Sequence, residues 1–176
     1  YPELLKHIPD PPLVLYVKGQ TNALQMGNQS LAVVGSRRPS HYGVGMASSL
    51  SVSAVSSGWA VISGLAIGID TAAHKAVVDA DGVTVAVLGS GLGRLYPQEN
   101  LDLARQIVSK GAVISEFPMN FPPDRRSFPM RNRIISGMSC GTVVVEAGLK
   151  SGTLITADQA ADQGRTVFAV PGRADQ

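Results

Sequence analysis

The sequence predicts an α/β domain in which helices cover both faces of a mostly parallel β-sheet. From Leu31 onward, short runs of apolar, β-branched residues alternate with segments rich in alanine and serine. Continuous apolar strands that alternate with helices are typical of a parallel sheet buried on both sides, which gives three layers. The 176 residues suffice for one domain with a sizeable core, and the 44% hydrophobic content argues against disorder.

The alternation places each element of the sheet and its cover. We expect strands at 31–35, 60–63, 84–88, 112–115, 142–146 and 166–170. We expect helices at about 43–57, 70–80, 99–109, 129–138 and 153–163. Prolines at 2, 9, 11 and 12 precede a short apolar run at 13–17. Residues 1–29 are therefore expected to form an N-terminal arm with one edge strand, and 30–176 the core.

Composition excludes several classes of protein. No apolar run approaches the roughly 20 residues that span a bilayer, and no signal-peptide pattern begins the chain, so we expect no membrane partner. The one cysteine, Cys140, allows no internal disulfide and fits a reducing cytoplasm. No Cys/His cluster has zinc spacing, and we expect no metal and no cofactor. The first residue is Tyr1, so we expect a piece of a longer chain.

Charge is concentrated where the strands end. The net charge is only +2, but the loops after the strands gather at the carboxyl edge of an open α/β sheet, where ligands bind. Seven of the ten arginines fall there: Arg37, Arg38, Arg94, Arg125, Arg126, Arg131 and Arg133. So do five of the nine aromatic residues: Tyr42, Tyr96, Phe117, Phe121 and Phe128. Guanidinium groups that hold phosphates and rings that stack bases are what a groove for single-stranded nucleic acid requires.

The predicted helix 129–138 carries two arginines in an unusual place. Pro129 suits the first turn of a helix, and Arg131 and Arg133 would follow within that turn. The helix dipole is positive there, so two arginines cost stability unless an anion binds between them and the free N–H groups. The alternative is that both are solvated and paired with distant carboxylates.

Two loops offer further contacts for an anion. Gly35-Ser36-Arg37 after the first core strand could cradle a phosphate or could simply be a tight turn, and it matches neither a dinucleotide fingerprint nor a P-loop. Ser151-Gly152-Thr153 before the last helix predicts an N-cap, which could equally face a phosphate.

Candidate catalytic groups have structural alternatives. Asp70 and His74, spaced i and i+4, could form an acid/base pair, or Asp70 could cap the helix while His74 packs. Glu146 ends an apolar strand and could be a catalytic carboxylate, or could accept hydrogen bonds from a neighbouring loop. Cys140 has no evident base partner and is expected to be a small core residue.

Several motifs occur in a fixed order along the chain: Gly35–Arg37, Ser63–His74, Tyr96-Pro97 with Asn100, Ser115–Phe117, Phe128–Ser139, Val145–Ala147, Ser151–Thr156 and Val167–Gly172. Together they resemble the DNA-processing protein A (DprA/Smf) family over essentially the whole chain. The resemblance implies an extended Rossmann-like domain that binds single-stranded DNA in the bacterial cytoplasm without a required enzymatic step. It also implies a homodimer that protects incoming DNA during natural transformation (competence) and helps to load the RecA recombinase.

The resemblance also implies roles for individual residues. Arg37 matches the first DNA-contacting arginine, Arg125 a basic contact, and Phe128 the base-stacking ring, with Arg131, Asn132 and Arg133 lining the same pocket. The full predicted nucleic-acid site is Gly35, Ser36, Arg37, Gly64, Arg125, Phe128, Arg131, Asn132, Arg133, Ser151 and Thr153.

The chain departs from the family pattern in some places. Ile67 stands where many members have a basic or other residue, and Gly93 replaces a frequent acidic one. Family members often add an N-terminal helical domain and a C-terminal winged-helix domain, and neither fits within this sequence.

Two other functions are compatible with parts of the sequence. Gly141–Glu146 is similar to the signature of lysine-decarboxylase-like (LOG) hydrolases, which cleave the N-glycosidic bond of a nucleoside monophosphate. Here Glu146 lies one residue further from the Gly-Thr pair, and Met138-Ser-Cys140 stands in place of Pro-Gly-Gly. The third possibility is a binding module for a small nucleotide or second messenger.

Overall fold

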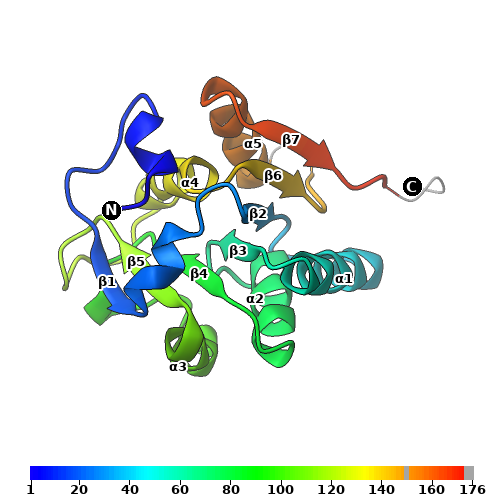
Figure 1. The fold of residues 1–176 in the computed structure, drawn as a ribbon, viewed down its shortest axis with the longest axis horizontal. Helices are drawn as coiled ribbons and strands as arrows, with labels where there is room; N and C mark the ends of the chain where they lie inside the picture. The colour runs from blue at the N-terminus through cyan, green and yellow to red at the C-terminus, as the bar shows by residue number, and fades with distance from the viewer. Residues whose placement is uncertain (149–150, 173–176) are drawn as a thin grey trace.

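A computed structural model describes residues 1–148 and 151–172, which form one seven-stranded sheet between two layers of helices (Figure 1). The strands are β1 Tyr16–Gly19, β2 Ser30–Val34, β3 Ala60–Ser63, β4 Thr84–Val87, β5 Ala112–Ser115, β6 Gly141–Val144 and β7 Thr166–Ala169. Their order is β1-β5-β4-β3-β2-β6-β7, and all neighbours are parallel except β1, which runs antiparallel to β5. The predicted α/β fold is confirmed.

The helices divide between the two faces of the sheet. In Figure 1, α1 (His41–Ser56), α2 (Ile69–Asp79) and α3 (Leu101–Lys110) lie on one face, and α4 (Ser127–Gly137) and α5 (Gly152–Asp162) lie on the other. The short 3-10 helices are η1 Leu4–His7, η2 Thr21–Gln25, η3 Leu92–Arg94 and η4 Gln98–Asn100, and η4 takes the first two residues of the helix predicted at 99–109.

Separate apolar clusters fill the two sides of the sheet. On the α4 side, Ile134 and Ile135 pack with Leu5 and Ile8 of the N-terminal arm, so the arm closes the core rather than hanging from it. On the other side, α1 and α2 cover β2 and β3, and α3 covers β4 and β5. The edge strand was predicted to begin at Leu13 but begins at Tyr16. Leu13 is 98% exposed, and Tyr16 is the first residue that pairs with β5.

Helix α4 begins at Ser127, two residues before the predicted start. The Ser127 hydroxyl donates to the main-chain oxygens of Gly89 and Asp124, which fixes the chain at this point. Pro129 is then the third helical residue, where its missing N–H costs nothing because first-turn N–H groups have no partner in the helix. Arg131 and Arg133 consequently lie beyond the first turn, which corrects the placement predicted from the sequence.

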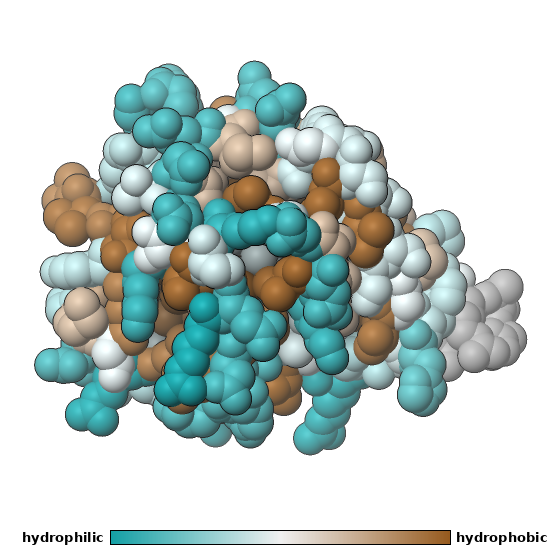
Figure 2. All heavy atoms as spheres, turned by 60° about the horizontal axis from the view of Figure 1, so that its bottom comes forward, coloured by the Kyte–Doolittle hydropathy of each residue, from teal (hydrophilic) through white to brown (hydrophobic). Residues whose placement is uncertain are grey.

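The surface between the elements is mixed in character. Figure 2 shows one face on which most projecting side chains are hydrophilic and hydrophobic atoms appear between them. Over the described residues, none of the helices combines the length and the apolarity required for a membrane span.

The strand order creates a switch point beside β2. From β2 the chain builds β3, β4 and β5 in one direction, and later places β6 and β7 on the opposite side of β2. The connections that leave β2 and β6 therefore diverge at the carboxyl edge and leave a crevice, which is where ligands bind in open α/β sheets.

Candidate nucleic-acid interface

A cavity of about 840 Å³ opens at this switch point, between the loops after the parallel strands and helices α4 and α5. Its lining includes nine of the eleven residues predicted from the sequence: Gly35, Ser36, Arg37, Arg125, Phe128, Arg131, Asn132, Ser151 and Thr153. Segments far apart in the chain are therefore brought together at one edge of the sheet, as the loop positions predicted.

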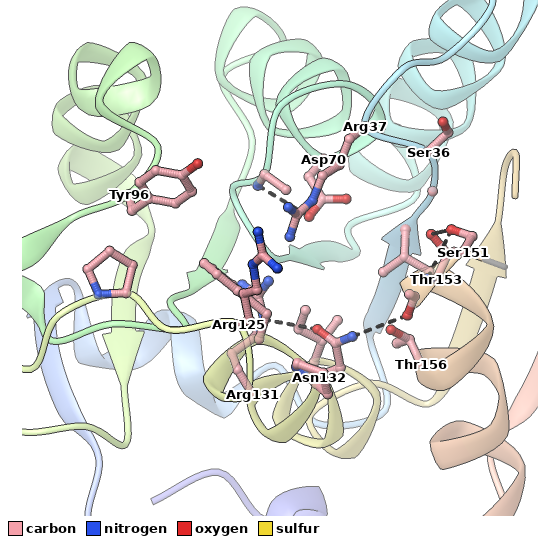
Figure 3. Close-up of a pocket in the computed structure, with 18 of the residues that line it drawn as sticks. Ser36, Arg37, Asp70, Tyr96, Arg125, Arg131, Asn132, Ser151, Thr153 and Thr156 are labelled. Atoms are coloured by element: carbon pink, nitrogen blue, oxygen red, sulfur yellow. Dashed lines mark hydrogen bonds between the residues drawn. The ribbon is translucent and has the colours of Figure 1, made fainter. Parts of the chain in front are cut away.

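Three arginines that form no ion pair among the described residues line this cavity: Arg37, Arg38 and Arg125. Arg37 follows β2 and Arg125 precedes α4, and Figure 3 shows both side chains pointing into the cavity from opposite walls. Both are exposed, and neither forms an ion pair within the described part of the chain. The cavity therefore has a positive electrostatic field that favours an anionic ligand.

Aromatic rings lie at one end of the cavity. The Phe128 ring centre is 5.9 Å from that of Tyr96 with a 49° tilt between the planes, and the Arg37 guanidinium lies 5.2 Å from the centre of the Phe128 ring. Gly89 borders the same ring, since a Cβ there would lie 2.6 Å from its edge. The Phe128 ring is thus fixed in position and only half-buried.

The start of α5 forms the opposite end of the cavity. Ser151 caps the helix, because its hydroxyl accepts the Thr153 N–H at 3.2 Å. Thr156 lies one turn further along the same wall and is 2% exposed. The hydroxyl groups and the positive end of the helix dipole make this end suited to a phosphate.

Arg131 has a different role from the other arginines, because it is buried beneath the cavity. Its Nη1 donates to the main-chain oxygens of Gly64, at 2.6 Å, and of Val87, which follow β3 and end β4. Its Nε donates at 3.1 Å to Asn132 Oδ1, and Asn132 Nδ2 reaches the Gly152 oxygen at 3.5 Å (Figure 3). Arg131 therefore joins strand ends and orients Asn132 toward α5.

The charge of Arg131 faces a buried carboxyl group. Burial lowers the pKa of Arg131 to about 10, against the opposing effect of Asp70, so the guanidinium is charged at neutral pH. Burial raises the pKa of Asp70, while Arg131 and N–H groups act in the other direction. Asp70 Oδ2 accepts the N–H groups of Gly64 and Ala66 at 3.0 and 3.3 Å. Asp70 thus orders the loop before its helix.

Glycine is required at two positions of that loop. A Cβ on Gly64 would lie 2.6 Å from Arg131 Nη1, so any larger residue would displace the guanidinium. Gly68 has φ +91° and packs against the Ser36 carbonyl oxygen, where a Cβ would collide. The loop after β3 therefore supports the loop after β2 that carries Arg37.

Arg133 does not face the cavity, contrary to the prediction. Its Nη1 and Nη2 donate to Glu116 Oε1 and Oε2 at 2.6 and 2.7 Å, and its Nε donates to the Asp10 main-chain oxygen at 3.0 Å. Burial alone would lower the pKa of Arg133, but its bonds to Glu116 and Asp10 raise it. The helix turns Arg133 away from Asn132, so it ties the N-terminal arm to α4.

The candidate catalytic residues all have structural partners. His74 Nδ1 lies 2.7 Å from Thr84 Oγ1 and forms no hydrogen bond with Asp70. Glu146 accepts the Ser40 N–H and, at 2.9 Å, the Ser40 hydroxyl, as the structural alternative predicted. Cys140 is half-buried rather than a core residue, and its thiol donates to the Ser30 oxygen. In residues 1–148 and 151–172, no group of three or more His, Cys, Asp or Glu side chains could hold a metal ion.

A family model, DNA recombination-mediator protein A, matches residues 1–176. The chain belongs to this family. DNA processing protein DprA of Bacillus subtilis (strain 168) is 46% identical over 172 residues, which are 98% of this chain and 58% of that protein. The X-ray structure of DNA processing protein A (DprA) from Streptococcus pneumoniae matches with a TM-score of 0.92 at 40% identity, over 99% of this chain and 60% of that one.

A second solved structure of a DprA protein gives the same fold. DNA processing protein A from Helicobacter pylori, whose structure concerns its single-stranded DNA binding mode, matches with a TM-score of 0.91 at 28% identity. The match covers 100% of this chain and 80% of that one. The chain thus spans somewhat over half the length of the Bacillus and Streptococcus relatives.

The DprA-family cavity includes residues that sequence reasoning did not select. Thr156 lines the wall one turn after Thr153, a spacing of three residues that places both on one face of α5. Tyr96 was counted among the aromatic residues of this edge but not included in the site. Its position in the loop after the third predicted core strand, directly before Pro97, was the available signal.

Proposed function

We propose that this DprA-family chain binds single-stranded DNA in the switch-point cavity and catalyses no reaction on it. The observation that carries the proposal is the pairing of free guanidinium groups with a half-buried aromatic ring in one cavity. Arg37 and Arg125 would hold phosphates, and the start of α5 would add hydroxyl and N–H groups. Phe128 would stack a base, which works for any base because each has a π-face.

Family membership supports a wider role for the whole protein. We propose that it acts in the cytoplasm, protects incoming single strands during natural transformation and helps to load a RecA-type recombinase. The absence of a catalytic step is part of the proposal, because Asp70, His74 and Glu146 are each engaged in holding the fold.

The proposed homodimer has a candidate surface at β7. All four residues of this edge strand are exposed, including Phe168 at 52%, and Leu154 and Ile155 of the adjoining helix α5 are each 38% exposed. A strand with an unpaired edge and exposed apolar side chains invites pairing with another chain. We propose that two copies meet there.

The hydrolase of the LOG type remains the second candidate but receives less support. Its carboxylate would have to act on a nucleotide in the cavity, whereas Glu146 is bonded to Ser40 and does not contribute to the cavity lining that the structure describes. Capping α1 accounts for this side chain without a reaction.

The test is an anisotropy titration of labelled oligo-dT at low and high salt, with duplex DNA and nucleoside monophosphates as competitors. We expect affinity to fall with salt, with a slope of about −0.7 per phosphate contacted. Competition by unlabelled single strands but not by monophosphates is also expected. Affinity that stays flat with salt would contradict phosphate binding, and displacement by a monophosphate at stoichiometric concentration would favour the nucleotide module.

A further inference from the structure

A side pocket of about 90 Å³ leaves the main cavity beside Phe128. It is lined by the apolar side chains of Ile67, Tyr96, Pro97 and Phe128, and Ile67 and Tyr96 are 45% and 46% exposed at its mouth. Flat apolar walls of this size suit an unstacked nucleobase. Neither Ile67 nor Tyr96 belongs to the apolar clusters that fill the two sides of the sheet.

The side pocket holds one carboxylate beside two arginines, Arg37 and the buried Arg131. Glu99, in the 3-10 helix before α3, lines it and is exposed. Within the described ranges its carboxylate forms no hydrogen bond and no ion pair, although Arg37 and Arg131 line the same pocket. A free carboxylate repels phosphate, so the sugar–phosphate backbone should run along the Arg125 and α5 side while the bases turn toward Glu99.

A carboxylate only accepts hydrogen bonds, which restricts the base that it can contact. Cytosine presents an amino donor at position 4, and pairing of Glu or Asp with this group is a known mode of base recognition. Thymine and uracil present a carbonyl oxygen at position 4, and their one N–H lies between two carbonyl oxygens. The carboxylate would therefore meet repulsion from these bases where it meets a donor on cytosine.

We propose that this side pocket receives one base of the bound strand and that Glu99 makes it favour amino-bearing bases over thymine and uracil. The inference rests on the proposed single-strand binding and deepens it. It assigns Glu99 as a specificity-determining residue in a groove that otherwise holds phosphates and stacks bases without distinguishing sequence.

The alternative role for Glu99 is structural, because an acidic residue ahead of α3 also stabilises the start of that helix. The two roles make different predictions for Glu99→Gln. Loss of the helix contribution would lower thermal stability without changing base preference. Loss of base recognition would change the ratio of affinities for two oligonucleotides, which stability does not affect.

The experiment is a competition titration of oligo-dC against oligo-dU of equal length, at a mildly alkaline pH where cytosine is unprotonated. Uracil lacks the thymine methyl group, so the two strands differ in the donor and acceptor groups of the base ring alone. We expect the wild-type chain to bind oligo-dC about fivefold more tightly, near the lower end for one recognised base. Glu99→Gln should bring the two affinities within about twofold, because an amide both donates and accepts.

The matched control is Asp79→Asn. It removes one exposed negative charge at the last residue of α2, whereas the first turn of that helix borders the cavity. The preference for oligo-dC should therefore stay unchanged. Equal wild-type affinities for the two strands with salt-sensitive binding intact would overturn the base pocket and leave the proposed function standing. A preference that survives in Glu99→Gln would overturn the role of Glu99. Binding to neither strand would overturn the proposed function itself.

Discussion

The Arg37 guanidinium lies 5.2 Å from the centre of the Phe128 ring. The side chain proposed to bind a phosphate therefore contacts the ring proposed to stack a base. A base that stacks on this face must displace Arg37. An exposed cation–π contact contributes about 0.5–1 kcal/mol, less than the 1–3 kcal/mol per base of aromatic stacking. The exchange is therefore favourable, and it frees the guanidinium for a neighbouring phosphate.

The stacking role predicts a specific effect for Phe128→Ala. We expect single-strand binding to weaken by about 1–3 kcal/mol, with the same dependence on salt, because the ring carries no charge. Titration at several salt concentrations separates the two effects. Phe128→Tyr keeps the ring and serves as the control; equal weakening by both variants would contradict stacking.

The phosphate role predicts different effects for two adjacent arginines. Arg125 points into the cavity, whereas the Arg126 side chain is 93% exposed outside it, 3.9 Å from Asp124. Arg125→Ala should weaken binding and reduce the magnitude of the salt slope by about 0.7, the value for one phosphate on a single strand. Arg126→Ala removes the same charge and should leave the slope almost unchanged. Equal slope changes would mean that only net charge matters.

The ion pair between Arg133 and Glu116 predicts a loss of stability rather than of DNA binding. Both side chains are 13% exposed, so removing one partner leaves a largely buried charge. We expect Arg133→Met and Glu116→Gln each to lower the free energy of unfolding, with a coupling of about 1–3 kcal/mol in a double-mutant cycle followed by urea unfolding. The salt dependence of DNA binding should stay at its wild-type value. A smaller salt slope in Arg133→Met would mean that Arg133 contacts a phosphate after all.

The positions of Arg37, Arg125, Arg131 and Arg133 in the structure show which parts of the site could be predicted from the sequence. The strand-end loops were located by hydrophobic periodicity, which is local, and the carboxyl-edge rule then gathered Arg37, Arg125 and Phe128. Arg131 and Arg133, two residues apart, point about 200° apart around the helix axis, so they could not both face the cavity, and tertiary packing decides which one does. The bond from Ser127 to Gly89, 38 residues earlier, set the start of α4 two residues before the proline signal.

Long-range partners account for the remaining differences. Arg131 is separated by 67 residues from the Gly64 carbonyl that it holds, and no local pattern distinguishes a buried arginine from a solvated one. Glu99 was passed over because the sequence placed it in the predicted helix 99–109, outside the loops that follow the strands. Its position in the side pocket depends on how the loop after β4 folds against Phe128.

The proposed dimer predicts that Phe168→Glu yields a monomer. The side chain is 52% exposed on edge strand β7, where a charge would be buried on pairing with a second copy. Light scattering coupled to size exclusion would measure the mass, with Val52→Glu, which adds the same charge at an exposed apolar residue of α1, as the control that should leave the mass unchanged. A wild-type chain that is monomeric at high concentration would rule out this surface.

The buried histidine predicts a loss of stability in mild acid. The Thr84 hydroxyl donates to the Val61 oxygen at 2.7 Å, so His74 Nδ1 must donate to Thr84, which leaves Nε2 as the site for an added proton. Burial, with the nearby charge of Arg131, lowers the pKa of His74 from 6.5 to about 3. The unfolded chain binds a proton below pH 6.5 while the folded chain does not.

This difference in proton binding gives the sign and size of the effect. As pH falls from 6.5 toward 3, the free energy of unfolding should decrease by about 1.4 kcal/mol per unit, or about 2 kcal/mol between pH 7 and pH 5. The raised pKa of Asp70 acts in the opposite sense, because stability from that group falls as pH rises. It is present in all the variants compared.

The comparison that isolates His74 uses His74→Asn, whose amide can still donate to Thr84 but does not titrate. Urea unfolding of this variant at pH 7 and pH 5 should show about 2 kcal/mol less acid destabilisation than the wild-type chain. His7→Asn changes a histidine whose side chain is 69% exposed and should behave as the wild type. An equal response to acid in all three proteins would mean that His74 Nε2 becomes protonated within the fold, and the expected contribution of His74 to acid destabilisation would then be wrong.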